Sequence, residues 1–245
     1  MNGMLKQTEQ APQEIYGEHC LRKNHRQELV LAVEKQMAKF CASLTKNIFT
    51  LAELAESRDP EIGSHLERVS VTSALLAGAW QKVAAAPEKM PENFVENIRQ
   101  TSVLHDIGKI GISNNILLKS DGLTGTEFEI IKTHTLIGTQ IVAAMKEGYP
   151  STILNMALEI IRSHHECWDG SGYPDGLAGD SIPLSARIIG VVDAYDVIRS
   201  KRCYKMGLSH KTACDIIRAE SGRQFDPRLV TLFLKKKEKF EQIYI

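Results

Sequence analysis

Apolar residues recur every three or four positions along most of the chain, which is the spacing of one face of an α-helix. The first such stretch covers residues 25–57, and a second covers 64–86 and ends where Pro87 and Pro91 mark a turn. Further helices are predicted over residues 92–106, 125–146, 151–165, 184–199, 209–220 and 226–241. The β-branched residues follow this helical spacing and do not alternate. The pattern therefore predicts an all-α fold.

Two loops interrupt the predicted helices. The first, "KIGISNNILLKSDGLTG", covers residues 109–125, and the second, "WDGSGYPDGLAGDSIP", covers 168–183 and is rich in glycine and proline. Long loops without secondary structure of their own are more often functional than not. We therefore expect both loops to lie at a site.

The length of 245 residues suits one large domain. We expect an N-terminal helical extension over residues 1–45 and a main domain over 46–245. The long N-terminal helix could pair two copies of the chain into a homodimer, or it could cover the core of its own domain.

The overall charge is balanced, with 30 basic and 30 acidic residues, so the chain has no global field to attract duplex nucleic acid. Its apolar runs are far shorter than the roughly 20 residues of a membrane span, and the first residues lack the apolar stretch of a signal peptide. We expect a cytoplasmic protein that does not bind membranes. The five cysteines form no CxxC pair and are expected to be reduced thiols.

Histidines and carboxylates gather at particular points of the pattern. Five of the eight histidines lie near a helix end or a carboxylate: His65, His105, His134, His164 and His165. A single histidine of this kind is usually structural, but five together point to metal binding.

The local spacing of these residues limits how they can share metal ions. Glu61 and His65 are four apart and would project from one face of a helix, either as ligands or as an ordinary surface pair. Adjacent residues on a helix diverge by about 100°. His105 and Asp106, and likewise His164 and His165, are therefore expected to serve neighbouring metal ions better than one. Asp193 is a carboxylate within an apolar helix, where it needs a metal, a base or a hydrogen-bond network.

Eight candidate donors exceed the roughly six ligands of one octahedral ion, so two or three ions fit better than one. The donors are Glu61, His65, His105, Asp106, His134, His164, His165 and Asp193. Mixed imidazole and carboxylate ligands without cysteine favour iron, manganese or another first-row ion over structural zinc or calcium.

Several blocks of the sequence together resemble the HD-GYP family of HD-domain phosphohydrolases. They are "HLERV", "LHDIGKIGI", "IKTHTLIG", "SHHECWDGSGYPDGLAGDSIPLSARI", "VVDAYD" and "RCYK", and they span about residues 58–235. The resemblance implies a helical HD-domain bundle, a centre of two or three metal ions, and a phosphodiesterase of bacterial signalling that acts on cyclic di-GMP.

The resemblance also implies roles for individual residues. Asp106 would bridge two metals, with the other seven donors completing the centre, and Lys109 would reach the scissile phosphate. Tyr173 of the Gly-Tyr-Pro signature, Arg202 and Lys205 would hold the dinucleotide. A hydroxide bridging the metals would attack the phosphodiester to give pGpG, GMP or both.

Other functions remain open at this point. The substrate could be another cyclic dinucleotide such as cyclic GMP-AMP, and other HD-domain enzymes hydrolyse other nucleotides. The domain could also be a cyclic-dinucleotide receptor without turnover, although degenerate members lose ligands and all eight donor positions are filled here.

Overall fold

The computed structural model describes residues 64–83, 90–119, 121–144, 151–200 and 207–244, with residues 35, 46–48, 50, 52 and 53 before them. By its internal contacts the chain divides into two units, Met1–Lys46 and Asn47–Ile245. The helical extension expected over residues 1–45 lies almost wholly outside the described residues and stays a prediction. The fold below is that of the second unit.

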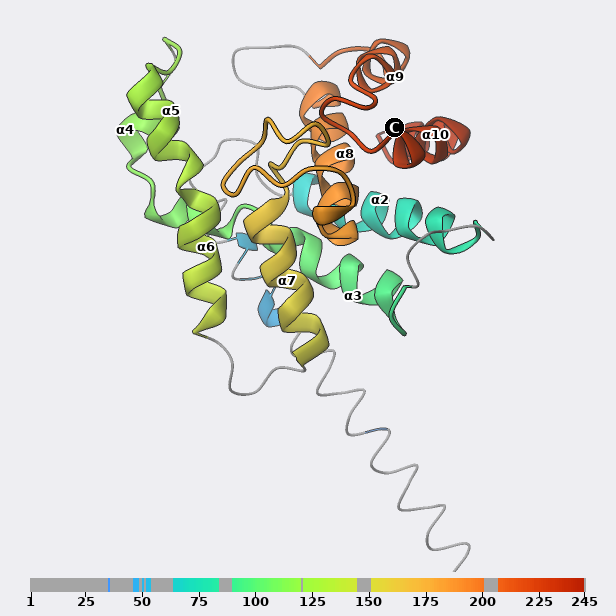
Figure 1. The fold of residues 1–245 in the computed structure, drawn as a ribbon, viewed down its shortest axis with the longest axis horizontal. Coiled ribbons are helices and arrows are strands. Elements are labelled where there is room, and N and C mark those ends of the chain that lie inside the picture. Colours follow the sequence, from blue (N-terminus) through green and yellow to red (C-terminus); the bar gives the residue numbers. More distant parts are fainter. Residues whose placement is uncertain are drawn as a thin grey trace, which may run out of the picture. The chain divides into compact units, whose positions relative to one another are not determined.

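The described chain is helical, which confirms the predicted fold class (Figure 1). Its α-helices are α2 (Ser64–Gln81), α3 (Phe94–Thr101), α4 (Asn114–Leu117), α5 (Gly125–Lys132), α6 (His134–Ala143), α7 (Ser151–Ser163), α8 (Leu184–Arg199), α9 (His210–Ala219), α10 (Pro227–Lys235) and α11 (Lys237–Gln242). Three 3-10 turns join them: η1 (Ser102–Leu104), η2 (Ile107–Gly111) and η3 (Gly179–Ser181). The described residues form no β-strand, only an isolated bridge between Ser221 and Phe225. None of these helices combines the length and apolarity needed to cross a membrane.

Three predicted elements differ from the structure. The helix expected over 125–146 breaks at Thr133, because the Thr133 hydroxyl donates to the Ile130 carbonyl (2.6 Å) and the Thr133 amide turns back to the same oxygen (3.1 Å). This break places His134 at the start of a new helix. The first predicted loop, 109–125, also contains α4, which Ser113 caps by accepting from the Asn115 amide. The helix expected over 226–241 is divided between α10 and α11 at Lys236.

The main core lies where α2, α8, α9 and α10 meet (Figure 1). Tyr195 at its centre packs edge-on against Phe233 and Phe240, with ring centroids 5.2 and 5.7 Å away. All three side chains are fully buried. Burying a large apolar side chain stabilises a fold by roughly 1.5–3 kcal/mol, so this cluster holds α8 in place.

A second, smaller core supports the turn between η1 and η2. Val103, Leu104 and Ile107 are buried in it, together with residues of α2, α6 and α7. Gly108 lets η2 approach α6 closely, since a Cβ there would lie 1.8 Å from the His134 carbonyl oxygen. The packing thus anchors the polar pair His105 and Asp106 and brings it against the start of α6.

Candidate metal centre

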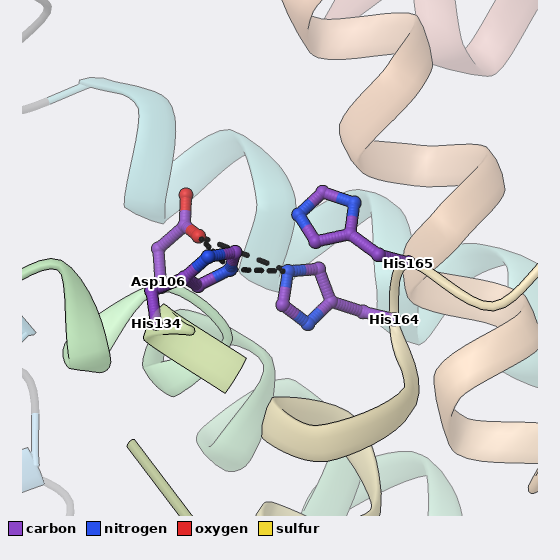
Figure 2. Close-up of side chains that lie close together, drawn as sticks. All are labelled: Asp106, His134, His164 and His165. Carbon is purple, nitrogen blue, oxygen red and sulfur yellow. Dashed lines mark hydrogen bonds and ion pairs between the residues drawn. The ribbon is translucent and has the colours of Figure 1, made fainter. Parts of the chain in front are cut away.

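Four predicted ligands from three segments form one cluster (Figure 2). Asp106 lies in the turn between η1 and η2, His134 begins α6, and His164 and His165 follow α7. One ligand atom from each residue lies within 4.8 Å of all the others. Figure 2 shows the Asp106 carboxylate and the His134 ring turned toward the ring of His164. This group, called cluster A below, has the spacing that a bound ion requires.

Three further predicted ligands form a second group, cluster B: His65 of α2, His105 and Asp193 of α8. Asp193 Oδ1 lies 3.7 Å from His105 Nε2 and 3.9 Å from His65 Nε2. His105 Nε2 is also 3.4 Å from Asp106 Oδ2. Asp106 therefore faces both clusters, and its two oxygens can serve neighbouring ions.

The adjacent pairs divide differently from one another. His105 and Asp106 belong to different clusters, as their divergence on a helical turn predicts. His164 and His165 both belong to cluster A, with ring centroids only 4.0 Å apart. We expected these two histidines to face neighbouring ions, but the structure places both in one cluster. The reason is that α7 ends at Ser163, so the 100° divergence between adjacent residues of a helix does not apply to the turn that follows.

Backbone carbonyls determine which ring nitrogens face the clusters. Nδ1 of His105 is 2.9 Å from the Ser102 oxygen, and Nδ1 of His134 is 2.7 Å from the Ile131 oxygen. Nδ1 of His164 lies 3.0 Å from the Ile160 oxygen. A carbonyl only accepts hydrogen bonds, so each Nδ1 carries the proton and donates it. Each Nε2 then presents a lone pair to the site, which is the tautomer of a metal-binding histidine.

These lone pairs face one another and need a cation between them. Nε2 of His134 is 3.5 Å from Nε2 of His164 and 3.2 Å from Asp106 Oδ1. Within the described part of the chain, Asp106 Oδ1 is buried and has no hydrogen-bond partner. Burying acceptors against acceptors is costly unless a positive charge satisfies them. The donor set therefore fits a metal ion.

Burial and charge set the protonation states that metal binding requires. Burial disfavours the charged form of Asp106, but the Lys109 ammonium and the neighbouring His105 and His134 together outweigh burial and lower the pKa of Asp106 well below its usual value. Burial lowers the pKa of His164 and, more strongly, that of His165. At neutral pH the carboxylate is therefore ionised and these two imidazoles are neutral, so few protons must leave when an ion binds.

Asp196 fixes the orientation of His65, a member of cluster B, through a hydrogen bond to the ring nitrogen that faces away from the cluster. Its Oδ2 accepts from His65 Nδ1 at 2.8 Å, and its Oδ1 accepts from Arg68 Nε at 2.6 Å and from the Tyr244 hydroxyl at 2.5 Å. A carboxylate that holds the far nitrogen of a metal-binding histidine fixes its ring and raises its basicity. Accordingly, although burial opposes protonation of His65, the bond to Asp196 raises its pKa.

The loop after the histidines is held by a buried carboxylate. Glu166 is 7% exposed, and its two oxygens accept from the amides of Asp175 (2.8 Å) and Leu177 (3.0 Å). Gly172 is required where the loop returns over its own start, since a Cβ there would lie 2.3 Å from the Cys167 nitrogen. Glu166 thus gives the Gly-Tyr-Pro segment a defined path beside cluster A.

Tyr173 and Lys109 border cluster A. The Tyr173 ring stacks on the His165 ring at 4.8 Å and 25°, and the Tyr173 amide donates to the His165 carbonyl. Burial raises the pKa of Tyr173, so its hydroxyl stays protonated at neutral pH. Nζ of Lys109 lies 2.5 Å from Asp106 Oδ2, with a quarter of its side chain exposed. Both residues therefore lie where a ligand of the cluster would meet them.

Three predicted site residues, Glu61, Arg202 and Lys205, lie outside the described residues. Sequence reasoning missed Asp196 and Glu166. The signal for Asp196 was a second carboxylate three positions after Asp193 in the same apolar helix, and the signal for Glu166 was an acidic residue directly before the glycine-rich loop. Asp196 accepts a hydrogen bond from His65, a member of cluster B, and Glu166 accepts hydrogen bonds from amides of the loop that carries Tyr173.

Comparison with known proteins agrees with this geometry. A family model described as an HD domain matches residues 50–229. A protein of Vibrio cholerae named a probable cyclic di-GMP phosphodiesterase is 41% identical over 198 residues, which are 80% of this chain and 45% of that protein. One of Thermotoga maritima named a cyclic di-GMP phosphodiesterase is 37% identical over 233 residues, 92% of this chain and 60% of that protein. The chain thus spans about half the length of the curated relatives it matches.

Further similarities concern a related substrate and the fold. A Vibrio cholerae protein named a 3'3'-cGAMP-specific phosphodiesterase is 35% identical over 193 residues, 79% of this chain and 35% of that protein. A crystal structure titled as a cyclic GMP-AMP specific phosphodiesterase of the same species matches with a TM-score of 0.57 at 18% identity, covering 81% of this chain and 50% of that one. That likeness shows the fold alone. With its family match over residues 50–229, its helical architecture and its two histidine and aspartate clusters, the chain belongs to the HD-domain family.

Proposed function

We propose that the chain is a metal-dependent phosphodiesterase that hydrolyses cyclic di-GMP to pGpG, GMP or both. The observation that carries the proposal is the pair of adjoining clusters, A and B, with the two oxygens of Asp106 between them. Enzymes that cleave phosphodiesters commonly use two neighbouring metal ions. The names of the relatives support the choice of substrate.

Different residues of the chain have different roles in the proposed reaction. Two neighbouring divalent ions, when bound, supply an activated water and neutralise charge on the phosphoryl oxygens. Asp106 lies between the two clusters and offers one carboxylate oxygen to each. Lys109 beside it presents a positive charge to the phosphate of the substrate. Tyr173 holds the dinucleotide through its ring and its protonated hydroxyl. Arg202 and Lys205, which match the basic residues of the family motif, are proposed to bind the dinucleotide as well.

The proposed ions are iron or manganese, two or three to a chain. Neither cluster includes a cysteine, and both mix imidazole with carboxylate, which suits these first-row ions. Glu61 would add a ligand next to His65 and so favour a third ion. Metal analysis of protein purified without chelators, before and after loading with ferrous iron or manganese, measures both identity and number.

The experiment that tests the function combines metal content with product analysis. The metal-loaded wild-type chain should convert cyclic di-GMP to pGpG or GMP on chromatography. Asp106→Ala should lose turnover together with metal, because this residue faces both clusters. His134→Ala and His65→Ala should each lose metal chiefly from one cluster. Full turnover by Asp106→Ala would contradict the scheme.

A second substrate, cyclic GMP-AMP, is supported by the relative named for it. Parallel assays of both dinucleotides decide between them through the ratio of kcat/KM. Full metal occupancy with tight binding and no turnover of either would instead identify a receptor and overturn the enzymatic proposal.

Three further expectations belong to the same proposal. Residues 1–45 would form a helical extension that pairs two chains, so removing them should convert a dimer to a monomer in light scattering. The balanced charge supports the absence of duplex nucleic acid binding, which a gel-shift assay tests. A cytoplasmic location is tested by fractionation of cells that express the protein.

A further inference from the structure

Helix α5 carries a large aromatic side chain, Phe128, that is 44% exposed. The helix starts at a capping box formed by Thr124 and Glu127, and none of its residues is buried. Its position is therefore not explained by a contribution to either core. A partly exposed aromatic ring offers a flat surface on which a ligand base can stack.

Phe128 lies at the end of a row of rings that begins in cluster A. The His134 ring contacts the His165 ring, with centroids 5.1 Å apart, and His165 stacks on Tyr173. Tyr173 in turn meets Phe128 edge-to-face, with centroids 6.4 Å apart and an interplanar angle of 80°. The row leads from the candidate metal centre to the exposed face of α5, so a ligand bound at cluster A can extend along it.

Lys132, one helical turn after Phe128, places a positive charge at the end of this row. Its Nζ lies 5.0 Å from the centroid of the Phe128 ring and 5.5 Å from that of Tyr173. It also pairs with Glu129 at 2.7 Å, but the Glu129 side chain is 68% exposed. An exposed pair of this kind contributes little to stability, so the ammonium can exchange this carboxylate for a phosphate at low cost.

We propose that Phe128 and Lys132 form a second contact surface for the cyclic dinucleotide, an inference that rests on the function proposed above. Such a ligand carries two phosphodiesters and two flat purine bases. Only one phosphodiester can occupy the metal centre beside Lys109 at a time. Lys132 binds the phosphodiester that is not being cleaved, and Phe128 stacks against a base.

Direct binding tests the inference without relying on turnover. The probe is a phosphorothioate analogue of cyclic di-GMP that resists hydrolysis, titrated calorimetrically into the metal-loaded full chain. Phe128→Ala should raise Kd about tenfold, and Lys132→Met should do the same, because each removes a stacking or charged contact. Only Lys132→Met should also weaken the dependence of Kd on salt.

Two matched variants serve as controls. Ile130→Ala removes another exposed apolar side chain of α5, and Lys211→Met removes an exposed, ion-paired lysine of α9. Both should keep the wild-type Kd. Metal content and thermal midpoint are compared for all variants, so that a variant that fails to fold is recognised, with Phe128→Leu as the milder replacement.

The outcomes separate this inference from the proposed function. If the wild-type chain binds the analogue and Phe128→Ala and Lys132→Met bind it equally well, the second contact surface is wrong and the phosphodiesterase proposal stands. If the wild-type chain binds cyclic di-GMP without hydrolysing it and these variants bind less tightly, the contact surface stands and the enzymatic proposal fails. A wild-type chain that binds no cyclic dinucleotide overturns both.

Discussion

Nδ1 of His65 lies 2.8 Å from Oδ2 of Asp196, and this hydrogen bond turns the opposite nitrogen of His65 toward cluster B. The two residues are 131 positions apart, on α2 and α8. Asp196 is almost fully buried and also accepts from Arg68, so one carboxylate orients a candidate metal ligand and neutralises a cation. The packing of α2 against α8 therefore contributes directly to the geometry of cluster B.

Replacing Asp196 with asparagine should weaken metal binding at cluster B by about 10–100-fold, because the amide cannot hold His65 in the same tautomer. Metal titration monitored by elemental analysis measures the change. Asp215→Asn, which removes an exposed carboxylate paired with Lys211 on α9, is the control and should leave metal affinity unchanged. Wild-type metal affinity in Asp196→Asn would show that Asp196 does not position His65.

Gly108→Ala should destabilise the fold by about 3 kcal/mol, because the new Cβ overlaps the His134 carbonyl oxygen and forces η2 away from α6. The same displacement separates His134 from Asp106, so metal content should fall as well. Urea unfolding measures the free energy. Gly78→Ala, in the last turn of α2 with no atom within 4 Å of its new Cβ, should instead stabilise by about 0.5–1 kcal/mol. Equal effects of the two substitutions would contradict the close packing of η2 on α6.

Glu166→Ala should raise KM for cyclic di-GMP about tenfold, since the loop that carries Tyr173 loses two hydrogen bonds to a charged acceptor. Steady-state kinetics with metal content measured in parallel tests this. Asp169→Ala provides the comparison, because Asp169 lies on the same loop but only holds the exposed Ser171. An unchanged KM in Glu166→Ala would mean that the path of the loop does not limit substrate binding.

The start of α5 should be sensitive to acid. The hydrogen bond from Lys119, together with that from the Thr124 amide, lowers the pKa of Glu127 from 4.5 to about 2. A lowered folded-state pKa means that the stabilisation is complete above about pH 4.5 and is lost as the pH falls toward 2. Cα chemical shifts of α5 should therefore move toward coil values in that window before those of α10 do.

Glu127→Gln provides the control for this titration, because it removes the carboxylate that caps the helix, so the Cα shifts of the first turn of α5 should change less across the window than in the wild-type chain. If the wild-type helix kept its shifts down to pH 2 relative to α10, Glu127 would not be what holds its first turn.

The sequence by itself determined where most helices lie and which residues to consider as ligands. Helical periodicity is a local property, since each residue of a helix face is three or four positions from the next. The observed bounds of α7, α8 and α9 accordingly lie close to the predicted ones. The histidines and carboxylates stood out because polar, ionisable groups are costly inside apolar helices. The periodicity did not reveal the helix breaks at Thr133 and Lys236, because the apolar pattern continues across both positions.

Only the tertiary structure decided how the ligands divide into groups. Whether His164 and His165 share a cluster depends on the end of α7, and whether Asp106 faces two clusters depends on how η1 and η2 pack beneath it. The supporting role of Asp196 and the row of rings that ends at Phe128 join segments far apart in the chain. Such contacts follow from which helix faces meet in the folded domain, and no local spacing encodes that meeting.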